Sequence, residues 1–130
     1  MQAVVHFVPT RKPLVALTFD DGPTAGVTDR IVGLLSKHGA KGTFFMVGKS
    51  VRANKTIISD VVSAGNAVGI HGYSHLKGMK EWHREEILYD FRMARDELAQ
   101  ATNSMVLLAR PPFGNVSEGI LSVIAQLGMK

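Results

Sequence analysis

Short apolar runs alternate with amphipathic segments along almost the whole chain, and this rhythm constrains the fold more than any other feature. Apolar or β-branched runs typical of buried strands cover residues 14–19, 42–47, 67–70 and 105–109. Apolar residues at helical spacing mark residues 31–38, 57–62, 84–101 and 120–127. The alternation predicts an α/β domain built from parallel βα repeats. Because the sequence does not define strand order, part of a distorted (β/α) barrel and an open flavodoxin-like sheet both fit.

The length and composition limit the kinds of protein that this chain can be. A chain of 130 residues is the size of one domain; we expect an N-terminal extension at residues 1–13 and the domain at 14–130. The chain has no cysteine, which excludes disulfides and thiolate chemistry. No apolar run is long enough to span a membrane. The net charge of +4 is scattered along the chain, so we predict no nucleic-acid partner.

Three polar segments each follow one of the predicted strands. They are Thr18-Phe19-Asp20-Asp21-Gly22, His71-Gly72-Tyr73-Ser74-His75 and Arg110-Pro111-Pro112-Phe113-Gly114. Active sites of parallel α/β folds gather at the carboxyl ends of the strands. The sequence therefore predicts one site that combines two adjacent carboxylates, a pair of histidines and an arginine.

The aspartates and histidines point to a metal site. Asp20 and Asp21 are also compatible with a turn in which one carboxylate caps a helix. However, neighbouring side chains at a strand end point in different directions, so one carboxylate can bind a metal while the other stays free as a base. His71 and His75 lie four positions apart in a segment that reads as a loop. Two imidazoles and one carboxylate suit zinc with an open position, and also cobalt, nickel or iron(II).

Arg110 and two aromatic residues are further candidates. Arg110 precedes two prolines; it is either a surface residue at a rigid turn or a fixed guanidinium that keeps a carboxylate base ionised and oriented. Tyr73 lies between the two histidines and is a candidate to pack on a sugar ring, whereas Trp82 is expected to pack against a helix. For His6, His38 and His83 we expect structural or solvated roles.

The three segments resemble the first three motifs of the polysaccharide deacetylases, the NodB-type homology domain of the family-four carbohydrate esterases. Residues 18–22 match T-F-D-D-G, residues 71–75 match H-x-x-x-H, and residues 110–114 match R-P-P-Y/F-G. The family often has serine or threonine after the first histidine, where this chain has Gly72. That departure removes a hydroxyl that usually supports the loop but leaves the ligands intact. The resemblance extends from about Leu14 onward.

The resemblance implies a role for each matching residue. Asp20 resembles the general base, and Asp21 resembles the carboxylate metal ligand. His71 and His75 resemble the imidazole ligands, and Arg110 resembles the residue that orients the base. The implied reaction is metal-dependent hydrolysis of N-acetyl groups on N-acetylglucosamine-containing polysaccharide, with zinc as the expected metal and cobalt or nickel as alternatives.

The implied substrate is an N-acetylated polysaccharide or oligosaccharide of peptidoglycan or chitin type. We expect Tyr73, Pro112 and Phe113 to contact the sugar. Such a substrate favours an extracellular or cell-wall location. The first 13 residues lack the layout of a signal peptide, so this location requires a leader outside the sequence, and a cytoplasmic location is the alternative.

The late motifs of the family, L-x-H with its proton-donating histidine and D-x-x-D-W, have no counterpart after Gly114. We therefore expect the N-terminal part of a deacetylase domain, about half of its barrel, with exposed sheet edges through which the chain self-associates. Two other functions remain open at this stage. One is a fragment that binds metal or sugar without turnover. The other is a receiver-like interaction module in which the aspartates bind magnesium, although this leaves the histidines and Arg110 unexplained.

Overall fold

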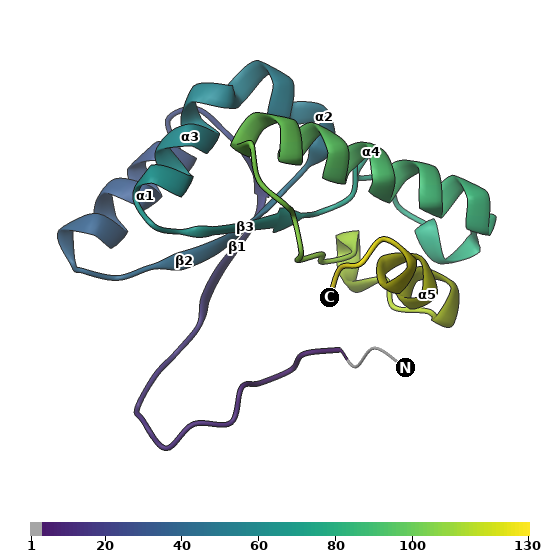
Figure 1. Cartoon of the computed structure of the whole chain (residues 1–130), viewed down its shortest axis with the longest axis horizontal. Coiled ribbons are helices and arrows are strands. Elements are labelled where there is room, and N and C mark those ends of the chain that lie inside the picture. Colours follow the sequence, from purple (N-terminus) through teal and green to yellow (C-terminus); the bar gives the residue numbers. More distant parts are fainter. Residues whose placement is uncertain (1–3) are drawn as a thin grey trace.

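The computed structural model describes residues 4–130, which form a three-stranded parallel sheet with helices packed against it (Figure 1). The strands are β1 (Leu17–Gly22), β2 (Gly42–Met46) and β3 (Ala67–Ile70). The α-helices are α1 (Thr28–Lys37), α2 (Gly48–Val51), α3 (Lys55–Ser63), α4 (Arg84–Thr102) and α5 (Glu118–Gln126). Short 3₁₀ turns cover Arg52–Asn54, Met79–Glu81 and Pro112–Gly114.

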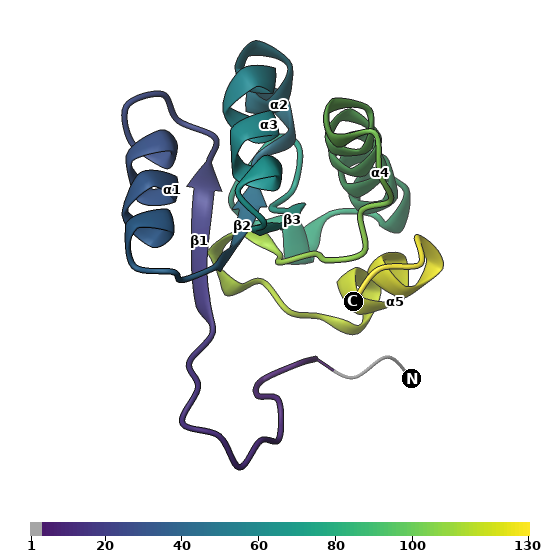
Figure 2. The same ribbon diagram turned by 60° about the vertical axis from the view of Figure 1, so that its left-hand side comes forward.

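The strands lie in sequence order, and the helices α1, α3 and α4 cover the same face of the sheet (Figure 2). The parallel α/β prediction is confirmed, because β1 pairs with β2 and β2 with β3 in parallel register. The flavodoxin-like alternative is wrong, since that fold has β1 in the interior of its sheet and helices on both faces. Sequential strands with helices on one side are the arrangement of a (β/α) barrel wall.

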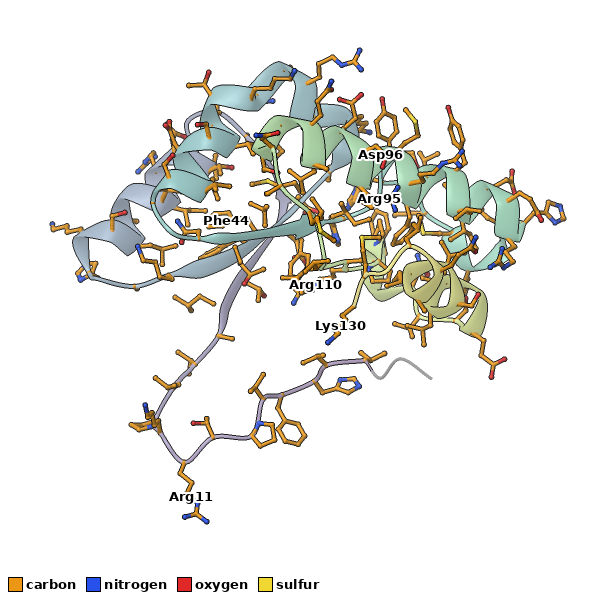
Figure 3. All side chains as sticks on the ribbon, in the orientation of Figure 1. Arg11, Phe44, Arg95, Asp96, Arg110 and Lys130 are labelled. Carbon is orange, nitrogen blue, oxygen red and sulfur yellow. The ribbon has the colours of Figure 1, made fainter. Side chains whose placement is uncertain are left out.

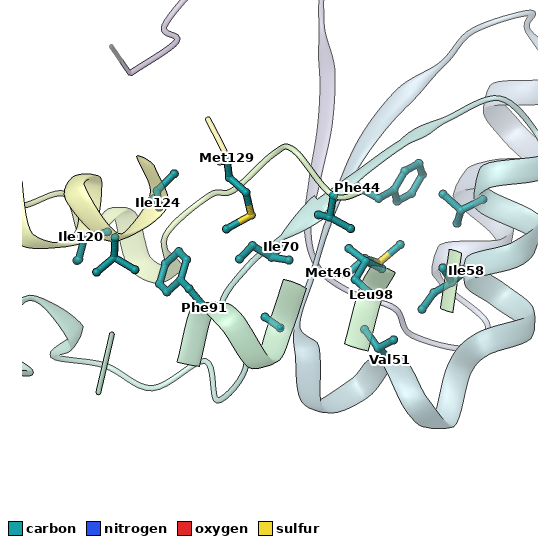
Figure 4. Close-up of a cluster of buried hydrophobic side chains, with 14 of the residues drawn as sticks. Phe44, Met46, Val51, Ile58, Ile70, Phe91, Leu98, Ile120, Ile124 and Met129 are labelled. Carbon is teal, nitrogen blue, oxygen red and sulfur yellow. The ribbon is translucent and has the colours of Figure 1, made fainter. Parts of the chain in front are cut away.

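The core lies between the sheet and the helices (Figure 4). Phe44 and Met46 of β2 point into it, and Phe91 of α4 and Ile70 of β3 meet them there. Burial of each such side chain contributes about 1.5–3 kcal/mol relative to exposure. Because the strands are anchored by this core, their carboxyl ends are fixed relative to one another.

The helices follow the predicted apolar stripes. In α4 the predicted stripe of Ile87, Phe91, Ala94 and Leu98 is buried. The helix ends at Asn103, whose left-handed φ of 49° stops it. Helix α5 begins after an N-cap serine whose hydroxyl accepts from the backbone N–H of Ile120 at 3.3 Å.

Two strand predictions need correction. Strand β1 begins at Leu17 rather than Leu14, because its pairing with β2 starts at Leu17 opposite Gly42. It continues through both aspartates to Gly22, with an irregularity between Phe19 and Gly22. The predicted strand at 105–109 is reduced to one parallel bridge between Ile70 and Ala109.

The bridge joins this segment to the last residue of β3. Ile70 donates its N–H to the carbonyl of Leu108 and accepts from the N–H of Arg110, each at 2.9 Å. On its other side the same segment exchanges two hydrogen bonds with Lys130, through Leu107 and Ala109. Although it is not a full strand, residues 107–110 therefore extend the sheet in the parallel direction.

Strand β1 forms the open edge of the sheet among residues 4–130, with β2 as its neighbour. Apolar side chains before and within it are exposed, including Val15 and Leu17. The expected exposed edge is therefore present, and self-association through it stays a prediction. In the part of the chain described, no helix combines the length and apolar content that crossing a bilayer requires.

Candidate metal and catalytic site

The first carboxylate of the site, Asp20, lies on β1 and is held by an arginine from a distant segment. Arg110 Nη1 donates to Asp20 Oδ1 at 2.8 Å and to Thr18 Oγ1 at 2.9 Å. The guanidinium carbon lies 4.2 Å from the centre of the Phe45 ring. Figure 3 shows Arg110 on the side of the sheet opposite α1, α3 and α4. Arg110 is thus fixed by stacking and in turn fixes one oxygen of Asp20.

The second carboxylate, Asp21, lies at the irregularity of β1 and adopts a left-handed φ of 69°. This conformation is uncommon for a residue with a side chain and turns Asp21 away from the direction of its neighbour. Its side chain is 70% exposed, against 36% for Asp20. The two adjacent aspartates therefore occupy different environments, as the predicted division into ligand and base requires.

His71 follows the last residue of β3 and is buried. Its backbone N–H donates to the carbonyl of Met46 at 2.8 Å, and its Nδ1 lies 2.7 Å from the carbonyl oxygen of Arg110. A carbonyl oxygen only accepts, so Nδ1 carries a proton in this hydrogen bond. The neutral imidazole then presents the lone pair of Nε2, which is the tautomer that a metal ligand needs.

Three donor atoms converge at one point. Asp21 Oδ1 lies 3.0 Å from His75 Nε2 and 3.4 Å from His71 Nε2. A ligand atom from each of these residues lies within 4.8 Å of the others. One carboxylate oxygen and two imidazole nitrogens form a donor set that suits zinc and related divalent cations. The residues present therefore fit a divalent metal, with Asp20 Oδ2 adjacent at 4.0 Å from His71 Nε2.

A cavity of about 350 Å³ lies over these residues. It is lined by Asp20, Asp21, His71, His75, Arg110 and Phe113, together with Pro111 and Gly114. The Phe113 ring lies 4.7 Å from the ring of His75, centre to centre, and forms an apolar wall beside the ligands. Six of the eight predicted site residues therefore line one cavity, and all of them except Phe113 have charged or metal-binding side chains.

The other two predicted sugar contacts lie elsewhere. Pro112 is fully buried, and its ring lies under Gly72, so it supports the histidine segment instead of lining the cavity. Tyr73 is partly buried beside Gly48 and lines a second cavity of about 540 Å³ with Trp82, Glu85 and Tyr89. Gly72, between His71 and Tyr73, has a left-handed φ of 70° and turns the chain. His71 therefore lines the first cavity and Tyr73 lines the second.

Sequence reasoning missed two residues that support the site. Thr18 accepts from Arg110 beside Asp20. Asp90 of α4 is buried and accepts from the backbone N–H groups of Tyr73 and Ser74. The sequence did contain a sign of this role for Asp90, because the acid lies in the apolar stripe of the helix with Ile87 and Phe91. A carboxylate at such a position is buried and needs hydrogen-bond partners.

Comparisons with known proteins identify the family of the chain. Residues 7–130 match the family model described as polysaccharide deacetylase. A peptidoglycan-N-acetylglucosamine deacetylase of Bacillus cereus is 29% identical over 121 residues, which cover 93% of this chain and 56% of the relative. The corresponding enzyme PgdA of Listeria monocytogenes serotype 1/2a is 31% identical over 110 residues, covering 85% of this chain and 23% of the relative.

Solved structures give the same fold. A family 4 carbohydrate esterase from Streptomyces lividans superposes with a TM-score of 0.83 at 30% identity, covering 88% of this chain and 59% of that one. A family pseudoenzyme from Bacillus anthracis superposes with a TM-score of 0.84 at 29% identity, covering 92% and 42%. The chain therefore spans little more than half, or less, of the proteins it matches.

Proposed function

Because the chain belongs to the polysaccharide deacetylase family, we propose that it carries the metal-binding part of a site that hydrolyses N-acetyl groups on N-acetylglucosamine-containing polysaccharide. The observation that supports this proposal is the convergence of Asp21, His71 and His75 beside a separately held Asp20. A receiver-like magnesium module gives no use for the histidines or Arg110. Family membership sets that alternative aside.

Asp21, His71 and His75 are the residues that would hold the metal. When bound there, zinc supplies Lewis-acid polarisation of the acetamide carbonyl and lowers the pKa of water. The hydrogen bond from His71 Nδ1 to the Arg110 carbonyl keeps Nε2 directed at the ligand cluster. Cobalt or nickel suits the same donors.

Asp20 is the general base of the proposal. Arg110 donates to its Oδ1, which orients the carboxylate and leaves Oδ2 free to accept a proton. Oδ2 lies 4.0 Å from His71 Nε2, so a water beside the ligand cluster is within reach. Attack of that water on the amide carbonyl carbon, with transfer of one proton to Asp20, gives a tetrahedral adduct. Its collapse breaks the bond to nitrogen, and the nitrogen takes up a proton from Asp20 or from water, so that acetate and an amine are released.

Phe113 is the proposed sugar contact, because its ring forms the apolar wall of the cavity. The proposed substrate is of peptidoglycan or chitin type, in line with the peptidoglycan and chitooligosaccharide deacetylases to which the chain is similar. A cell-wall substrate would place the protein outside the cytoplasm.

A second function is binding without turnover. The lining of the cavity favours this function. Apart from the base, the metal ligands and Arg110, it contains no acid among residues 4–130 that could protonate the departing amine. The similarity to a family pseudoenzyme is consistent with that alternative. Turnover by this chain would need the proton for the departing amine to come from Asp20, from water or from a group outside the chain.

Acetate release from N-acetylglucosamine oligomers by the purified chain, with zinc or cobalt added, separates the two functions. The matched control is Asp20→Asn, which keeps size and removes the base. Release that disappears in the control supports deacetylation by these residues. A folded, zinc-loaded chain that releases no acetate supports the binding function, and a chain that binds no divalent metal contradicts both.

A further inference from the structure

Both histidines of the site lie on one five-residue segment, His71–His75, which we call the histidine loop. Its backbone is left-handed at two places, since Gly72 has a φ of 70° and His75 a φ of 54°. Glycine adopts this conformation freely, so the strain lies at His75. A left-handed residue with a side chain costs about 1–3 kcal/mol and persists only when its surroundings impose it. The structure must therefore contain groups that hold the loop in this conformation.

Asp90 of α4 is the group that holds the loop's N–H donors. Its Oδ2 accepts from the Tyr73 N–H at 2.7 Å, and its Oδ1 accepts from the Ser74 N–H at 2.9 Å. Both oxygens of one carboxylate are thus used by successive residues just before His75. Hydrogen bonds from N–H groups to a carboxylate are about twice as strong as neutral ones.

The carbonyl groups of the same loop are held from the opposite side by α2. Gly48 N–H donates to the Gly72 carbonyl at 2.9 Å, and Lys49 N–H donates to the Tyr73 carbonyl at 3.2 Å. Lys49 Nζ also donates to the Ser74 carbonyl at 2.9 Å. The loop is therefore bonded between α2 and α4 through both sets of its backbone groups.

The two helices that hold the loop are themselves joined. An ideal Cβ at Gly48 would lie 2.8 Å from the Cα of Ala94, so the glycine allows α2 to approach α4 closely. Arg52 pairs with the nearly buried Glu97 of α4, and this hydrogen bond raises the pKa of the Arg52 guanidinium. Helices α2 and α4 therefore form one frame around the histidine loop.

The position of Asp90 is difficult to explain by folding stability alone. It is 5% exposed and lies in the apolar stripe of α4, where a charged group is costly unless it is fully bonded. An ideal Cβ at position 72 would lie 3.1 Å from Asp90 Oδ2, so the loop is shaped around this carboxylate. A neutral apolar residue would suffice if the position only filled the core.

We propose that Asp90 is a positioning residue of the metal site, which fixes the separation and direction of His71 and His75 by holding the backbone between them. The inference rests on the metal site of the proposed function and assigns to α4 a part in it. Its consequence is that metal affinity depends on a carboxylate that does not touch the metal.

The test compares Asp90→Asn with Asp96→Asn in the 130-residue chain. Asparagine keeps the shape of Asp90 but offers a single acceptor oxygen, so one N–H of the loop loses its partner. Asp96 lies on the same helix, is exposed, and pairs only with its neighbour Arg95 among the described residues. Zinc affinity is measured by competition with a chelating dye, and amide hydrogen exchange of Tyr73 and Ser74 is measured without metal.

We expect Asp90→Asn to weaken zinc binding by about 10- to 100-fold, the usual effect of removing a group that orients a ligand. Amide exchange at Tyr73 or Ser74 should accelerate, while Asp96→Asn leaves both quantities unchanged. Unchanged zinc affinity in a folded Asp90→Asn protein, even with lower thermal stability, would overturn the proposal and leave a structural role. If Asp90→Asn does not fold, Asp90→Glu, which moves both oxygens by one methylene, is measured in its place. Faster amide exchange at Tyr73 or Ser74 with no loss of zinc affinity would then overturn the proposal. Failure of the wild-type chain to bind zinc would instead reject the metal site itself.

Discussion

The two histidines and the two aspartates lie within a few ångströms of one another but are held in different ways. The histidine loop is bonded through its backbone to β2, α2 and α4. The aspartates lie on β1, which has one neighbouring strand among the described residues and an exposed outer edge. Asp20 is fixed only by the side chain of Arg110, and Asp21 contacts only the histidines themselves among the interactions seen here.

This difference separates two tasks of the site. Backbone hydrogen bonds within a packed frame place the imidazole nitrogens, so metal affinity should depend on the frame. The base, Asp20, lies on the edge strand β1 and is oriented by side-chain hydrogen bonds, so turnover should depend on Arg110 and Thr18. The comparison therefore predicts that variants of the two regions affect different measurements.

The largest expected effect is on the histidine side. His71→Ala removes a ligand nitrogen and the buried hydrogen bond to the Arg110 carbonyl. We expect zinc affinity to fall by more than about 100-fold, since loss of a group that only orients a ligand already costs about 10- to 100-fold. Unfolding free energy without metal should fall by about 1–3 kcal/mol, from the lost bond and the space left behind.

The control for this variant is His38→Ala, which removes an exposed histidine at the end of α1. It should leave both zinc affinity, measured by dye competition, and urea unfolding near the wild-type values. Zinc binding by His71→Ala within a few-fold of wild type would mean that the buried imidazole is not a ligand.

The fold was largely predictable because its signals are repeated and local. Apolar stripes predicted α1, α3, α4 and α5, and β-branched or aromatic runs predicted β2 and β3. Helix α2 was missed, because a helix of four residues has no periodicity to detect. The predicted strand at 105–109 was wrong, because the segment makes a single bridge to β3, and pairing along an apolar run depends on its neighbour rather than on its own composition.

The site was predictable where a residue type and a strand end coincide. That rule located the aspartates, the histidines and Arg110. It failed for the directions of Tyr73, which follows the left-handed Gly72, and of Pro112, which begins a 3₁₀ turn, because neither segment keeps the regular side-chain alternation of a strand. It also missed Asp90, which lies 17 residues from Tyr73 in sequence and joins the site only through the packing of α4.

The second prediction tests the aspartate side. Arg110→Met keeps an unbranched apolar stem beside Phe45 but removes the donor to Asp20. Acetate release, in a preparation where the wild-type chain is active, should fall by about 10- to 100-fold, because a misplaced catalytic group costs about this much. Zinc affinity should stay within about twofold, since the carbonyl that accepts from His71 belongs to the backbone of position 110 and is retained.

The effect on stability should be small. The side chains of Arg110 and Asp20 are each more than a third exposed. Loss of their ion pair should therefore lower the free energy of unfolding, measured in urea, by no more than about 1 kcal/mol. A zinc affinity that falls in parallel with acetate release would contradict the separation of tasks, since it would mean that Asp20 or the arginine side chain also supports the metal.

The smallest expected effect concerns Thr18, which shares Arg110 Nη1 with Asp20. Thr18→Val keeps the β-branched shape that suits an edge strand and removes only the hydroxyl acceptor. The arginine then loses one of two anchors while its stacking on Phe45 remains. Acetate release should fall about two- to fivefold, equivalent to the roughly 0.5–1 kcal/mol of an ordinary hydrogen bond, and zinc affinity should not change.

Thr18→Ser is the matched variant, because it keeps the hydroxyl and loses the methyl group. If the hydroxyl orients Arg110, serine should retain most of the acetate release that valine loses, even though serine suits a strand less well. If instead serine is the slower variant and valine equals wild type, the methyl group and not the hydroxyl matters. Position 18 would then act through the packing of β1, and Asp20 would depend on Arg110 alone.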